Sequence, residues 1–141
     1  MVTRRELLRL TPVVVAGLAL PLLTRAAYAG SYLDRAALLL SEAGTDIQAL
    51  RTKMTDEELV RVIHRIAEAR VGAASDMDVP KAVVKAHPHL LLVMAKVERA
   101  AQAALDGSFT MVVELCDDAR REESIFKKVL ADLGFSLPSA P

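Results

Sequence analysis

Several residue types that mark common functional sites are scarce or missing in this chain of 141 residues. A single cysteine excludes an internal disulfide framework, a four-cysteine zinc site and a cysteine-ligated iron–sulfur cluster. Tryptophan is absent and aromatic residues make up 4% of the chain, which argues against stacking platforms for nucleic-acid bases. Asparagine, a frequent hairpin-turn residue, is also missing, and no segment alternates apolar and polar residues as a strand does. These absences favour an all-α protein.

Charge of one sign is not in excess either. The 18 basic side chains balance 18 acidic ones, so the basic surplus of a nucleic-acid binder is lacking and we expect no such partner. No glutamate is followed three positions later by histidine, the spacing of di-iron bundles. The chain also has no Cys-x-x-Cys-His motif for covalent haem and no Gly-x-Ser-x-Gly nucleophile elbow. We therefore predict that the protein is not an enzyme.

The first thirty residues show the three zones of an export signal. Arginines open the chain, an apolar run covers residues 10–23, and small residues at Ala27 and Ala29 predict cleavage before Gly30. The run is about 14 residues long, shorter than the roughly 20 that a membrane-spanning helix needs. We expect no stable membrane anchor once the signal has been removed.

Paired arginines make this signal more specific. Arg4 and Arg5 are followed by one free position, then by Leu7 and Leu8, then by another basic residue. This segment resembles the signal peptides of the twin-arginine translocation pathway. The resemblance implies export by the twin-arginine (Tat) translocase into the periplasm in a folded state, often with a cofactor or a bound partner.

The mature chain predicts a single helical domain. We assign residues 1–29 to the signal peptide, 30–136 to a helical bundle and 137–141 to a mobile tail. Glycine and proline are few and separate four periodic segments, so we predict an antiparallel up-and-down four-helix bundle. Pro88 interrupts the third segment, and the rival architecture is three helices with a proline-kinked connector.

Local signals predict where the helices begin and end. Thr55, with Glu58 reaching back to it, is the expected cap of the second helix. Asp78 is expected to cap a short helix over residues 79–86, before a longer one that ends at Gly107. Gly134 is expected to end the fourth helix. The first helix, expected over residues 32–53, is predicted to bury one apolar stripe: Leu33, Ala36, Leu40, Ala43, Ile47, Leu50 and Met54. The second is predicted to bury Leu59, Ile63, Ile66 and Ala73, with Val62 and Ala69 beside them.

The three histidines are the candidate metal ligands. His87 and His89 flank Pro88 at a helix start, and His64 lies in the second segment. Two imidazoles beside one bend, with His64 as a third ligand, fit copper or zinc. The alternative is that His87 caps a helix and His89 is solvated.

The centre of the fourth segment is unusually polar. Glu123 falls on a buried stripe position, and a buried carboxylate needs a partner such as Arg120 or His64. One interpretation is a polar layer that binds a ligand or the charge of a partner. The other is a solvated helix face with local pairs such as Glu123 with Lys127.

The apolar run 90–94 covers more than a full helical turn. One buried stripe cannot hold all of it, so Leu91 and Leu92 are a candidate interface with another chain. Cys116 falls on the stripe of the fourth helix and is expected to be a buried, inert thiol.

Together these features predict a small exported helical binding protein without a cofactor. We expect it to act as an accessory or interaction subunit of a larger periplasmic protein, or as a homo-oligomer. In plan it resembles the small twin-arginine subunits of periplasmic flavin dehydrogenases, which carry the signal for a larger catalytic partner. The alternative is a periplasmic bundle that binds copper, zinc or haem. A third hypothesis is a small-ligand pocket around Glu123.

Overall fold

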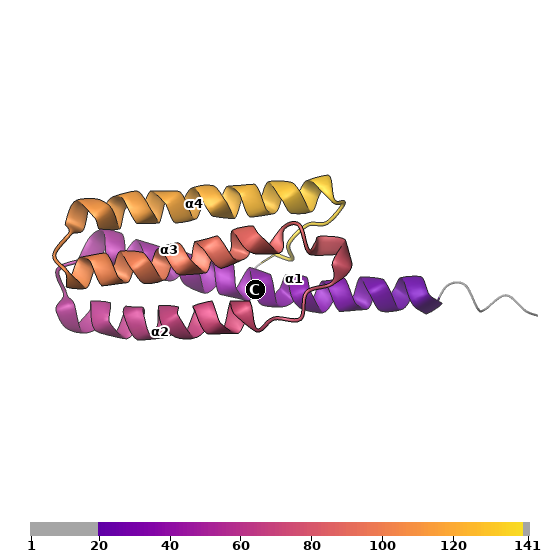
Figure 1. The fold of residues 1–141 in the computed structure, drawn as a ribbon, viewed down its shortest axis with the longest axis horizontal. Helices are drawn as coiled ribbons and strands as arrows, with labels where there is room; N and C mark the ends of the chain where they lie inside the picture. The colour runs from indigo at the N-terminus through magenta and orange to yellow at the C-terminus, as the bar shows by residue number, and fades with distance from the viewer. Residues whose placement is uncertain (1–19, 140–141) are drawn as a thin grey trace, which may run out of the picture.

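The computed structural model describes the backbone of residues 20–139 and the side chains of residues 29–139. Four α-helices run alternately up and down and pack side by side as a bundle (Figure 1). This arrangement confirms the predicted all-α four-helix bundle. Pro88 lies in the first turn of the third helix rather than kinking a connector, which overturns the rival architecture. The helices are α1 Leu20–Lys53, α2 Glu57–Ser75, α3 His87–Leu105 and α4 Phe109–Asp132, with a 3₁₀ turn, η1, at Lys81–Val83.

Helix α1 is longer than the sequence pattern predicted. It begins at Leu20 and runs without interruption through Ala27–Gly30 and through Gly44. Its first turns project beyond the end of the other helices (Figure 1). Cleavage before Gly30 stays a prediction, and the twin-arginine motif at Arg4, Arg5, Leu7 and Leu8 lies outside the described residues. Among the described helices, none combines the length and the apolar character that crossing a membrane requires.

The structure differs from the prediction at the start of α2 and in the segment before α3. The carboxylate of Asp56, not the hydroxyl of Thr55, caps α2 by accepting a hydrogen bond from the Leu59 backbone N–H at 3.1 Å. A carboxylate is the better cap because it also carries a charge that the helix N-terminus attracts. The helix expected over residues 79–86 is only the single turn η1, because Pro80 holds an extended backbone before it.

The helix ends follow the glycine signals. Gly107 and Gly134 have φ of +78° and +90°, angles that a residue with a Cβ adopts only with strain. The residue after each glycine donates its N–H back to the last helical turn: Ser108 to Ala103 at 2.9 Å and Phe135 to Leu130 at 2.8 Å. Phe135 then packs against the core.

One hydrophobic core runs along the bundle. α3 packs extensively against both α2 and α4, whereas α1 makes shallower contact with α2 and α4. The predicted stripe of α1 is buried, with Met54 partly exposed at its end. The buried side chains of α4 include Val112, Cys116, Ala119, Phe126 and Leu130.

The predicted stripe of α2 is wrong in its rotation. The residues that α2 buries are Val60, Ile63, Ala67 and Ala74. Val62 and Ile66 are 53% and 42% exposed, and Leu59 is only half-buried.

Polar residues of α2 explain this rotation. The observed stripe has His64 on one flank, facing α3, and Arg70 on the other, facing α1. At 100° per residue, the predicted stripe would have placed Arg70 among the core residues. Burying an unpaired guanidinium costs far more than exposing a valine and an isoleucine.

Candidate functional site

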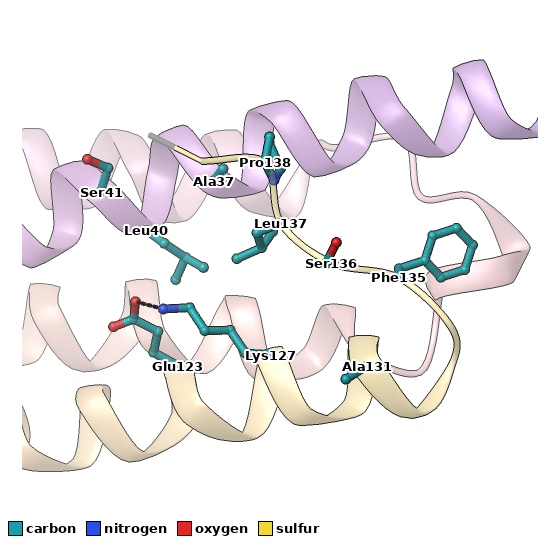
Figure 2. Close-up of a pocket in the computed structure, with 10 residues that line it drawn as sticks. All are labelled: Ala37, Leu40, Ser41, Glu123, Lys127, Ala131, Phe135, Ser136, Leu137 and Pro138. Carbon is teal, nitrogen blue, oxygen red and sulfur yellow. Dashed lines mark hydrogen bonds and ion pairs between the residues drawn. The ribbon is translucent and has the colours of Figure 1, made fainter. Parts of the chain in front are cut away.

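A groove between α1 and α4 is one of the concave sites of the described part of the chain, and the only one of them that the C-terminal segment helps to line. It encloses about 520 Å³ and opens to solvent along one side. Its lining comes from the two helices and from the chain that follows α4 (Figure 2). The lining residues are Ala37, Leu40, Ser41, Glu123, Lys127, Ala131, Phe135, Ser136, Leu137 and Pro138.

Small side chains create this space. Ala37 on α1 and Ala131 on α4 leave the two helices without bulky groups where they face the groove, and Leu40 lies between them (Figure 2). The wide separation of α1 from α4 agrees with the shallow contact between these helices. The result is an apolar floor of a size that suits a small ligand.

The C-terminal segment closes one end of the groove. After Gly134 the chain crosses from α4 towards α1, and Leu137 points into the groove while Pro138 lies against α1 (Figure 2). Leu137 is half-buried and packs against the core. The predicted mobile tail, 137–141, therefore supplies part of the groove wall up to Pro138, and its mobility stays a prediction.

Charged side chains form the other end of the groove. The Glu123 side chain is 15% exposed, and its carboxylate lies 2.9 Å from Lys127 Nζ and 3.3 Å from Arg120 Nη1. Gly44 of α1 faces Arg120, and a Cβ at position 44 would lie at an ordinary contact distance of 3.5 Å from the guanidinium. The structure thus gives Glu123 both the partner named for a polar layer, Arg120, and the partner named for a solvated face with local pairs, Lys127, so both interpretations stay open. Arg120 does not line the groove itself, but it pairs with Glu123 from outside, so these three charges together leave a net positive charge beside this end.

Ion pairs and histidine–carboxylate contacts join four pairs of helices within the described residues, whereas α1 and α3 meet without one. Three of these contacts involve residues in the polar centre of α4, and the others join charged or histidine side chains of α1, α2 and α3. The pairs are Arg70 with Glu42 and Asp46 between α2 and α1, His64 with Glu98 between α2 and α3, Lys96 with Asp118 and His89 with Glu122 between α3 and α4, and Arg51 with Asp117 between α1 and α4.

Each histidine has its own surroundings. His87 is 9% exposed and its Nδ1 lies 3.0 Å from the Tyr32 hydroxyl, and burial lowers its pKa below the usual 6.5. His89 Nδ1 lies 2.9 Å from a carboxylate oxygen of Glu122.

His64 lies elsewhere in the bundle, so the histidines do not form one site. It faces Glu98, nine residues beyond His89 along α3. At 1.5 Å per residue that is about 14 Å, beyond any shared coordination shell. The joint site of His64, His87 and His89 is therefore not assembled, because α2 and α3 are antiparallel and set His64 opposite the middle of α3.

The apolar run of α3 is mostly internal. Leu90, Val93 and Met94 are buried, Leu91 is half-buried against the core, and Leu92 is 41% exposed. The candidate interface at Leu91 and Leu92 is reduced to one exposed side chain. Val62 and Ile66 of α2 are both exposed and form a longer apolar row than Leu92 alone.

The thiol of Cys116 is fully buried in α4, and burial raises its pKa. A buried thiol with a raised pKa is a poor nucleophile. This position agrees with the expected inert packing role.

Sequence reasoning identified only part of the groove. It singled out Glu123 and its pair with Lys127, but not Ala37, Ala131 or the wall formed by the C-terminal segment. The alanines were visible in the sequence, but nothing local showed that they face each other across two helices far apart in the chain. Comparison of the chain with protein-family models, curated proteins and solved structures gives no match.

Proposed function

We propose that this protein is a binding protein that holds a small anionic amphiphile in the groove between α1 and α4. The observation that carries the proposal is the joint presence, in one groove of about 520 Å³, of an apolar floor and of Lys127, whose partner Glu123 is also paired with Arg120 from outside. Ligand sites in proteins commonly combine mostly apolar walls with a few polar groups that fix orientation.

The charges favour an anionic head group. Arg120, outside the groove lining, and Lys127, within it, both pair with Glu123, so across these three charges a carboxylate or sulfate beside Lys127 meets one cation in excess. Lys127 is exposed enough to turn towards a ligand, because 54% of its side chain is accessible. The apolar chain of the ligand then lies along Leu40 and Leu137. We propose binding rather than catalysis, because Glu123 is engaged by Arg120 and Lys127 in ion pairs and is not set up as a base for a nucleophile.

Calorimetric titration with decanoate tests this proposal. The wild-type chain is expected to bind one decanoate. Decanol, which lacks the charge, is expected to bind at least fivefold more weakly. Ala131→Leu fills the groove from an exposed position and is expected to weaken binding at least tenfold. Lys127→Glu reverses the charge that faces the head group and is expected to weaken binding to a similar extent.

Lys128→Glu is the matched control. Lys128 is the next residue on the same helix, pairs with Asp132 and does not line the groove. It is expected to keep the wild-type affinity within twofold. The groove would not be the binding site if Lys127→Glu and Lys128→Glu weakened decanoate binding equally, or if Ala131→Leu left it unchanged.

An interaction subunit of a larger periplasmic protein is the second candidate function. The observation in its favour is the outward face of α2, where Val62, Ile66, Ala69 and Ala73 are all exposed and share one side of the helix by their spacing. Exposed apolar rows of this kind are typical of surfaces that contact another chain. Periplasmic export by the twin-arginine route belongs to both proposals. Native mass spectrometry of the protein isolated from its own cells, compared with Ile66→Glu, tests for a complex that depends on this face.

A further inference from the structure

A second cluster of potential ligands lies at the interface of α2 and α3, away from the groove. It consists of His64 and Glu68, one helical turn apart on α2, and Glu98 on α3. One donor atom from each residue lies within 4.8 Å of the donors of the other two. His64 Nε2 is 3.3 Å from a Glu98 oxygen, and His64 Nδ1 is 3.9 Å from a Glu68 oxygen.

One buried ring nitrogen of His64 has no hydrogen bond within the described residues. The atom is Nε2, and it lacks a partner although the carboxylate of Glu98 is near. A buried polar atom left without a partner is costly, and such atoms commonly meet an ion or a water molecule. The adjoining carboxylates make a cation the natural occupant.

We propose that His64, Glu68 and Glu98 bind a divalent transition-metal ion, with zinc as the best match. Two carboxylates neutralise the charge of the ion, and one imidazole favours zinc over magnesium or calcium, which prefer oxygen ligands alone. Three protein ligands leave a fourth position for water.

The side chains have the freedom that such a site needs. Neighbouring donors around tetrahedral zinc are about 3.4 Å apart, given bond lengths of about 2.0–2.2 Å. The His64–Glu98 pair already has this spacing. Glu68 is 57% exposed, so a change of rotamer brings its carboxylate closer without disturbing the core, and the same opening admits the ion. Bound zinc would link α2 to α3.

Zinc titration of the full chain tests this site. The chain is purified without a histidine tag, stripped with a chelator and titrated by calorimetry. One zinc ion per chain is expected, with His64→Ala and Glu98→Gln each weakening the affinity at least tenfold. Zinc is also expected to raise the melting temperature of the wild type but not of Glu98→Gln, provided that circular dichroism shows both to be folded.

His89→Ala is the matched control. His89 also pairs with a carboxylate on a neighbouring helix, but within the described residues it has Glu122 alone as a carboxylate partner. Its removal is expected to leave zinc affinity within twofold of the wild type. The proposal fails if no saturable zinc binding occurs, if His89→Ala weakens it as much as His64→Ala, or if equimolar magnesium displaces the zinc. A failed zinc titration with intact decanoate binding would leave the groove proposal standing, because the two sites share no residue.

Discussion

The hydroxyl of Tyr32 lies 3.0 Å from Nδ1 of His87, joining the middle of α1 to the first residue of α3. The two rings also meet edge to face, with centroids 5.7 Å apart. The backbone of Ala74, at the end of α2, lies close enough to His87 to offset part of the lowering of its pKa by burial. The pair therefore joins α1 to α3 at one end of the bundle, and Tyr32 is only 2% exposed.

Acid should weaken the bundle through His87. Burial keeps the pKa of His87 below 6.5 in the folded protein, whereas the unfolded chain has the ordinary value. Between the two pKa values the unfolded state binds more protons, so the free energy of unfolding falls as the pH drops below about 7. Urea denaturation of the wild type and His87→Gln at several pH values from 8 to 5 measures this effect. A slope in His87→Gln as steep as in the wild type would contradict it.

Tyr32→Phe should destabilise the protein. It removes the hydroxyl and leaves Nδ1 of the buried His87 without that partner, a change that costs about 1–3 kcal/mol in the free energy of unfolding. Burial also raises the pKa of Tyr32 to about 12, so the wild type should lose stability above pH 10 as the unfolded chain ionises first. Denaturation of both proteins at pH 7 and pH 11 checks the two effects. Ionisation of Tyr32 should bring the free energies of unfolding of the two proteins closer together at pH 11. A larger difference at pH 11 than at pH 7 would refute this explanation.

The ion pair of Arg70 with Asp46 should matter more than surface pairs do. Both side chains are nearly enclosed, at 13% and 11% exposed, and burial raises the pKa of Asp46 even though Arg70 opposes the change. Arg70→Met leaves the carboxylate desolvated and unpaired, with an expected loss of about 2–4 kcal/mol in the free energy of unfolding.

Arg61→Met is the matched control for that experiment. Arg61 pairs with Glu57 one turn away on the same helix, and both side chains are mostly exposed. Its loss is expected to change stability by less than about 0.5 kcal/mol. Equal effects of the two substitutions on chemical denaturation would show that the α1–α2 pair is no stronger than an ordinary surface pair.

Gly44→Ala should stabilise the protein. Gly44 lies inside α1, and an added Cβ would meet the Arg120 guanidinium at an ordinary contact distance of 3.5 Å. Alanine in a helix interior is favoured over glycine by about 0.5–1 kcal/mol. Gly72→Ala, also inside a helix but facing open space, is the comparison. Thermal melts should rise for both, and a fall for Gly44→Ala alone would mean that Arg120 needs the space.

Periodicity predicted the class of fold and much of the core, but not how α2 is rotated. The stripe of α1 was visible because its apolar spacing is regular. α2 carries two apolar stripes, and the choice between them depends on partners for His64 and Arg70 that lie on other helices. The groove was hidden for a similar reason, because Ala37 and Ala131 are almost a hundred residues apart and only tertiary packing brings them to one site.

Heteronuclear NMR of the ¹⁵N-labelled chain during titration with decanoate tests the central claim most directly. The account predicts saturable shifts of backbone signals confined to the groove, above all near Leu40, Lys127 and Leu137, with the α2–α3 interface at His64 unmoved. Shifts spread over the exposed face of α2 at Val62 and Ile66, or no shifts at all, would contradict a ligand site between α1 and α4.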